Sequence, residues 1–253
     1  MKERSTYQEL NPSVELADYV HSYWTHQNLS GKPEVMKIFP DSFFKLVILF
    51  REGKILDFFM TGLWTESKGF TIPPKASTFG CRLRVLAPEY LLDQKIASLL
   101  NETRPLDSTF LSLDDWDLIS DFEIIVKHWE EALLRIMPDQ KVAKHKLRFS
   151  RLLYEMEGGI SATEFAEKAQ WSNRQISRYL NKYLGVSLKK YLNIQKCYKA
   201  YIQIREGRFF PEGAYFDQAH FVREIKKHTG ETPRELYKRQ HDLFIQLKNI
   251  KEK

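Results

Sequence analysis

A chain of 253 residues, 43% hydrophobic and 13% aromatic, has enough apolar side chains to fill one large core or two smaller ones. No apolar run approaches the ~18–20 residues of a membrane span, the charged N-terminus MKERSTYQEL lacks the apolar stretch of a secretory signal, and Cys81 and Cys197 are too few for a disulfide framework. With a net charge of +6, these features predict a globular protein of the reducing cytoplasm with no membrane partner.

The first regular segment is residues 13–24, SVELADYVHSYW, where apolar residues recur near helical spacing and Ser13 is a candidate N-cap. From about 34 to 86 the chain instead has short β-branched or aromatic runs such as FFKLVILF and KILDFFMTGLW, separated by turn residues. We expect a helix over 13–24, followed by a small antiparallel sheet or barrel.

Helical periodicity returns at about residue 88. The runs YLLDQKIASLL (90–100) and LDDWDLISDFEIIVKHWEEALLRIM (113–137) have apolar faces opposite acidic ones, and Pro138 ends the second. Residues 138–146 are predicted to be a linker. Beyond it we expect helices over 142–156, 161–170, 172–184, 187–206, 217–229 and 233–249.

The charge changes sign at the same place. Residues 1–140 hold 15 Lys and Arg against 21 Asp and Glu, a net charge of −6, whereas residues 141–253 hold 24 against 12, a net charge of +12. A basic module of this kind suits a polyanionic partner, and the acidic module has another task. We therefore predict an α+β N-terminal domain over 1–140 and an all-α domain over 141–253.

The basic half contains a weak internal repeat with an offset of 45 residues. Both copies have a capping residue, two core residues four apart, an arginine and a terminal glycine. The aligned pairs include Ser172 with Asp217, Ile176 with Phe221, Arg178 with Arg223, Leu180 with Ile225, Lys182 with Lys227 and Gly185 with Gly230.

The first copy has the layout of a helix-turn-helix. Ser161 and Glu164 form a capping-box pattern for one helix, and a short turn leads to a second helix opened by Ser172. Its outward residues lie where a recognition helix meets base edges, and the chemistry of Arg suits guanine and that of Gln adenine. The candidate base-reading residues are Arg174, Gln175, Ser177 and Arg178, with Lys182 placed for a backbone phosphate.

The helix predicted over 187–206 connects the two copies. About 20 residues at ~1.5 Å each give about 30 Å, close to the ~34–36 Å between successive major-groove faces. One monomer could therefore read two adjacent grooves on one side of duplex DNA.

These residues resemble the DNA-binding domain of the AraC/XylS family of bacterial transcription regulators over about 142–240. The strongest stretches are FDQAHFVREIKKHTGETP at 216–233 and EFAEKAQWSNRQISRYLNKYLGVSLKKYL at 164–192. The resemblance implies two helix-turn-helix units joined by a long helix, a transcription activator, and contact with RNA polymerase. In the second unit it implies base reading by Gln218, His220 and Arg223, with phosphate contacts from Lys226 and Lys227.

The chain departs from the family pattern before its second recognition helix. A scaffolding helix belongs there, but the segment is EGRFFPEGAY, in which Pro211 removes an amide donor and two glycines weaken a helix. We expect the linker helix or the aromatic residues Phe209, Phe210 and Tyr215 to support residues 217–229 instead.

The N-terminal part resembles the sheet domain of a subset of these regulators only loosely, through Pro40–Asp41, Gly62 and the run at 80–92. In the wider family such domains sense small molecules or form dimers, so a small-molecule effector and a homodimer are expected partners. Candidate residues for an apolar effector pocket are Phe43, Phe58, Trp64 and Phe79.

Two other functions stay open. One is non-specific or architectural DNA binding with a vestigial second helix-turn-helix, and the other is an enzyme with a site in the sheet domain. The sequence has no nucleophile motif, phosphate loop or metal-ligand spacing. We therefore expect no catalytic residues, no metal and no cofactor.

Overall fold

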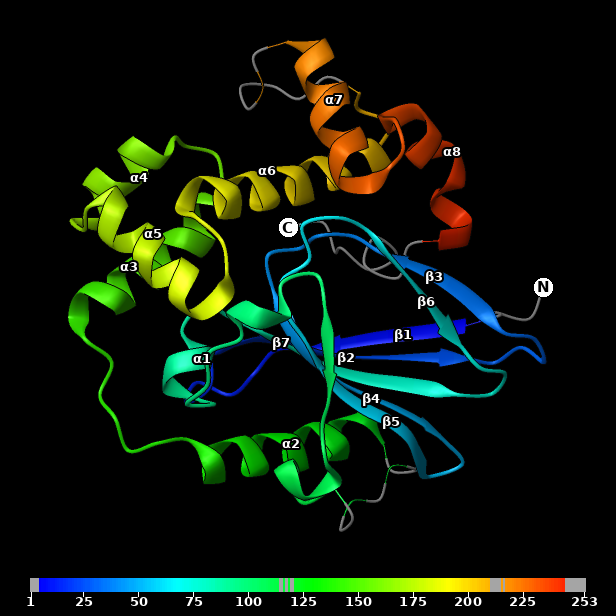
Figure 1. The fold of residues 1–253 in the computed structure, drawn as a ribbon. Coiled ribbons are helices and arrows are strands. Elements are labelled where there is room, and N and C mark those ends of the chain that lie inside the picture. Colours follow the sequence, from blue (N-terminus) through cyan, green and yellow to red (C-terminus); the bar gives the residue numbers. More distant parts are fainter. Residues whose placement is uncertain are drawn as a thin grey trace.

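The computed structural model describes residues 5–113, 116, 118, 121–209, 215 and 217–243, without the side chains of Ser5 and of 239–243. An N-terminal antiparallel sheet is followed by a helical C-terminal region, as the sequence predicts (Figure 1). The strands are β1 (Ser5–Leu10), β2 (Val20–Asn28), β3 (Glu34–Ile38), β4 (Phe44–Arg51), β5 (Lys54–Thr61), β6 (Lys68–Ile72), β7 (Ser77–Leu83) and β8 (Thr103–Pro105).

Six strands form one sheet in the order β1-β2-β7-β4-β5-β8, with every neighbouring pair antiparallel. The run FKLVILF of β4 is buried throughout, which explains its central place between β5 and β7. β3 and β6 pair separately as a two-stranded ribbon, which rises beside the C-terminal helices (Figure 1). The strands predicted between 34 and 86 are thus confirmed.

The helix predicted over 13–24 is wrong. Residues 14–19 form turns, and the chain then enters β2 between β1 and β7. Val20 and Tyr23 are fully buried in the sheet core. The segment HSYWTHQN is rich in aromatic and β-branched residues, so pairing on both edges outweighs the helical spacing of a few apolar positions.

The long helix predicted over 90–100 is also wrong. The structure has only α1 (Ala87–Tyr90) and the short 3-10 helix η1 (Ala97–Leu99), with Asp93 in the left-handed region at φ 48°. Leu91, Leu92 and Ile96 are nevertheless buried. Their apolar side chains pack in the core although the segment is irregular. The hydrophobic periodicity of a short apolar run cannot distinguish such a segment from a helix.

In the second predicted acidic segment (113–137), the helix begins after Asp121, and residues 114, 115, 117, 119 and 120 lie outside the described residues. This helix is α2 (Phe122–Ile136). A short 3-10 helix, η2 (Ser108–Leu111), and the left-handed Ser112 come before the predicted range. The remaining helices are close to their predicted positions, except that residues 244–249 of the last predicted helix lie outside the described residues. They are α3 (Lys144–Met156), α4 (Ala162–Ala169), α5 (Asn173–Leu184), α6 (Leu188–Arg205), α7 (Gln218–Thr229) and α8 (Pro233–Leu243).

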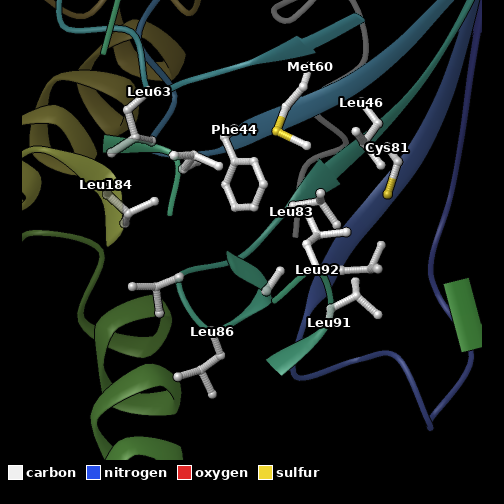
Figure 2. Packing of buried hydrophobic residues seen from close by; sticks show 14 of the residues in the cluster. Phe44, Leu46, Met60, Leu63, Cys81, Leu83, Leu86, Leu91, Leu92 and Leu184 are labelled. Carbon is white, nitrogen blue, oxygen red and sulfur yellow. The ribbon is translucent and has the colours of Figure 1, made fainter. Parts of the chain in front are cut away.

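One hydrophobic cluster crosses from the sheet into the helices. It includes Phe44 and Leu83 of the sheet together with Phe165, Ile176 and Leu184 of α4 and α5. Figure 2 shows Leu184 of α5 in one packed cluster with Phe44 of β4 and with Leu63 from the loop after β5. The division at 140/141 stays a prediction, and the packing is continuous across it.

Candidate nucleic-acid interface

The first recognition unit, residues 161–185, is held by caps and a small core. Ser161 accepts a hydrogen bond from the Glu164 amide (3.1 Å), and Gln170 ends α4 in the left-handed region. Ser172 and Gln175 form a capping box at the start of α5. These caps satisfy amides that have no partner inside the helix, so α5 begins at a defined residue.

Two residues one turn apart fix the orientation of α5. Ile176 and Leu180 are fully buried and pack in the same cluster as Phe165 of α4. The opposite face of α5 exposes Arg174, with Arg178 one turn later. Among the described residues, neither guanidinium has a hydrogen-bonding or ion-pairing partner, so both are available to a ligand.

The other two base-reading candidates of α5 have partners within the chain. The Gln175 side-chain oxygen accepts from the Ser172 hydroxyl (2.7 Å). The Ser177 hydroxyl donates to Asn173 (3.2 Å) and accepts from the Leu188 amide (3.2 Å) at the start of α6. Gln175 retains its amide donors and Ser177 one lone pair, so the two arginines are the freest groups on this face.

The second recognition unit, residues 206–230, repeats these features in α7. Asp217 caps the helix by accepting from the His220 amide (2.6 Å). Phe221 and Ile225 are buried at 1% and 0% exposure, in the places of Ile176 and Leu180. Gly230 ends α7 at φ 78°, as Gly185 ends α5 at φ 77°. The 45-residue repeat is therefore a structural repeat.

The polar candidates of α7 differ in exposure. Gln218 and Arg223 are exposed, whereas His220 is half-buried with its ring 5.7 Å from that of Tyr215. The phosphate candidates are exposed in both units: Lys226 and Lys227 on α7, and Lys182 on α5. The structure therefore brings the predicted cations to the outer faces of two capped helices.

The support of α7 is only partly what the sequence predicts. Pro211 and Phe210 lie outside the described residues. Tyr215 packs on Phe221 with ring centroids 5.0 Å apart, and the ammonium of Lys196 lies 4.1 Å from the centroid of the Tyr215 ring. The sequence misses a further partner, because Phe39 of the N-terminal part, 1% exposed, belongs to the cluster that packs α6, α7 and α8.

The four effector-pocket candidates are buried, at 5% for Phe43, 4% for Phe58, 5% for Trp64 and 0% for Phe79. Phe58 and Phe79 flank Ile48 from neighbouring strands. Phe43 stacks elsewhere, on His21 with centroids 4.2 Å apart. The structure thus places two of the four together in the sheet core, and an effector pocket stays a prediction.

The described residues contain no group of three or more His, Cys, Asp or Glu placed to hold a metal ion. In the same part of the chain, every helix is too short or too polar to cross a bilayer.

The comparisons with known proteins are sparse. A family model described as a domain of unknown function, DUF6597, matches residues 8–105, which include most of the sheet. The search of curated proteins gives no match. The match to the family model covers less than half of the chain and implies no activity.

Among solved structures, the chain is similar to ToxT from Vibrio cholerae. For ToxT of strain O395 bound to (E)-4-(8-methylnaphthalen-1-yl)but-3-enoic acid, the identity is 9% and the TM-score 0.45, over 81% of this chain and 97% of ToxT. For ToxT of strain SCE256 bound to an unsaturated fatty acid, they are 10% and 0.40, over 94% and 97%.

Proposed function

We propose that the chain is a sequence-specific DNA-binding transcription regulator of the AraC/XylS type, which reads two adjacent major-groove segments through α5 and α7. The observation that supports this most is the repeated recognition unit. Two helices 45 residues apart share an N-cap, a buried pair, an exposed arginine and a left-handed terminal glycine. An ordinary helical bundle has no need of such a repeat.

The chemistry of the two exposed faces suits duplex DNA. Arg174, Arg178 and Arg223 can each donate two hydrogen bonds to a guanine edge, and Gln218 can pair with adenine. Lys182, Lys226 and Lys227 supply charge for phosphates, which positions a protein without specifying sequence. α6, with 18 residues, extends about 27 Å at ~1.5 Å per residue, and this length supports placement of the two units in successive major-groove segments, ~34–36 Å apart.

The finer parts of the proposal follow from the family resemblance. They are activation through contact with RNA polymerase, a small-molecule effector or a dimer contact in the N-terminal part, and the absence of an enzymatic activity. None of them is needed for DNA reading by α5 and α7.

The test is selection of bound sequences from random duplex DNA by the whole chain. We expect a defined site, bound tighter than random duplex by about 10³-fold or more at physiological salt. Equal affinity for selected and random duplex contradicts the proposal and favours the architectural alternative.

A further inference from the structure

The C-terminal end of α5 is fastened to the N-terminal part of the chain. The amide of Ile96 donates to the carbonyl of Tyr183 over 2.9 Å. Gly185 then lies so close to η1 that a Cβ atom there would be 2.8 Å from the carbonyl oxygen of Ala97. This is a backbone-to-backbone contact with no room for a side chain, so it fixes where α5 ends.

The C-terminal end of α7 is fastened in a similar way by side chains. The carbonyl of Thr229 accepts from the ammonium of Lys37 (2.6 Å) and the hydroxyl of Ser67 (3.1 Å). His228 pairs through Nδ1 with the Thr65 carbonyl (3.0 Å). The last carbonyls of a helix lack intrahelical partners and carry partial negative charge, so a cation and a hydroxyl there are stabilising.

The Lys37 contact belongs to a larger docking surface. Lys37 also forms an ion pair with Glu231 (2.9 Å), in which both side chains are mostly buried, at 24% and 13% exposure. Two residues further along the chain, the ring of Phe39 lies 5.2 Å from that of Tyr201 on α6. The end of β3 thus contacts both the connecting helix and the second recognition helix.

The connecting helix itself is held at its other half. The hydroxyl of Tyr191 on α6 donates to the carbonyl of Ser42 (2.8 Å) and pairs with that of Tyr154 (3.1 Å), which accepts from the amide of Val85. In Figure 1, α6 runs across the top of the sheet part, with α5 at one end and α7 and α8 at the other. All three helices are therefore tied to one body.

We infer that the N-terminal sheet part is a rigid frame that fixes the spacing and relative orientation of α5 and α7, and that Lys37, Phe39 and Ser67 are positioning residues for α7. The consequence of this inference for DNA binding rests on the proposed function, whereas the rigidity itself does not. It assigns the sheet part a role in the geometry of the reading helices, in addition to any sensing or dimer contact.

The frame has a consequence for the DNA site. Moving one half of a site by one base pair shifts it by about 3.4 Å and turns it by about 35° around the duplex axis. A rigid pair of helices cannot follow this change, whereas a loosely held α7 can. The whole chain should therefore prefer one spacing strongly, and loosening α7 should weaken that preference.

The first experiment measures the distance between α5 and α7 in the absence of DNA. Spin labels at Lys182→Cys and Lys226→Cys report the distance between α5 and α7 by pulsed electron resonance, since the native cysteines are both buried. We expect one narrow distance distribution, which broadens when Lys37→Ala and Ser67→Ala are combined. Lys54→Ala, which changes an exposed lysine at the start of β5, is the matched control and should leave the width unchanged. A broad distribution in the wild type overturns the frame, and an unchanged width in the Lys37/Ser67 variant overturns the positioning role of these two residues.

The second experiment measures how the frame affects the preference of the protein for one spacing between the two halves of its DNA site. Binding of wild type and variants is compared on the selected site with its two halves moved by one or two base pairs. We expect a loss of about ten-fold per base pair for wild type and Lys54→Ala, and about three-fold or less for the Lys37/Ser67 variant. An equal weakening at every spacing contradicts a positioning role. If no two-part site is selected, the proposed function fails, and the distance measurement still decides the frame.

Discussion

The two recognition units keep the same local design but differ in what supports them. In the first, α5 rests on Phe165 of its own scaffolding helix α4. In the second, α7 rests on α6, on Tyr215, and on Phe39 of the N-terminal part. The two units thus share the same caps and core pairs, although the residues that cover the core pair come from different parts of the fold.

The largest expected effect on stability comes from removing the buried phenylalanine of either support. Phe39→Ala and Phe165→Ala each remove a side chain that is at most 1% exposed, which costs about 3–5 kcal/mol in the free energy of unfolding. Amide hydrogen exchange should rise in α7 and α8 for Phe39→Ala, and in α4 and α5 for Phe165→Ala. Identical exchange patterns would mean that the two supports are not distinct.

The terminal glycines should differ in their tolerance of a side chain. Gly230→Ala costs only the left-handed backbone strain, about 1–2 kcal/mol, because the nearest atom to an added Cβ is Lys37 Nζ at 3.9 Å, an ordinary van der Waals distance. Gly185→Ala meets the Ala97 carbonyl at 2.8 Å as well, so it should cost more. Urea unfolding of both variants checks the order, and equal costs would contradict the tight docking of α5.

The N-caps should be equivalent in the two units. Ser172→Ala and Asp217→Ala each remove a side-chain acceptor from the first turn, at a cost of about 0.5–2 kcal/mol. The exchange Asp217→Ser should be close to neutral, since either oxygen satisfies the same amide. Ser172→Asp should cost slightly more, because a carboxylate cannot donate to the Gln175 oxygen as the hydroxyl does. Thermal unfolding of the four variants tests this, and a large loss in either exchange would show that the copies are not equivalent.

The smallest effect concerns pH at the α7 contact. Burial lowers the pKa of His228 below its ordinary value of 6.5, against the opposing pull of Glu224 and the Thr65 carbonyl. The stability that His228 contributes is therefore complete above about pH 6.5 and is lost as the pH falls toward its lowered pKa. The urea midpoint of wild type should fall toward that of His228→Gln between pH 7.5 and 5.5. A constant difference between them would contradict this account.

Much of the helical half could be predicted from its sequence because its signals are local. Ser172, Asp217 and the two terminal glycines mark helix ends through their own backbone chemistry, and core pairs four apart give each helix its buried face. The strands between 34 and 86 have similar local signals in β-branched runs and turn residues.

The rest depends on partners distant in sequence. Residues 20–28 become a strand because β1 and β7 lie on either side. Leu91, Leu92 and Ile96 fill the core from a segment whose only regular element is the short 3-10 helix η1. Lys37, Ser67 and Phe39 carry no local sign of contact with α7. Their roles arise only when β3 is placed beside the C-terminal helices.

The most direct test of the account is a paired measurement of base specificity. Arg178→Ala and Arg223→Ala are each applied to the whole chain, and binding is measured on variants of the selected site at every position, with Arg135→Ala on α2 as the control for lost charge. Each reading variant should lose about 1–3 kcal/mol on the best site. Arg178→Ala should relax discrimination in one half of the site and Arg223→Ala in the other, while Arg135→Ala changes neither. If both arginine variants weaken selected and random duplex equally, α5 and α7 do not read bases and the central claim is wrong.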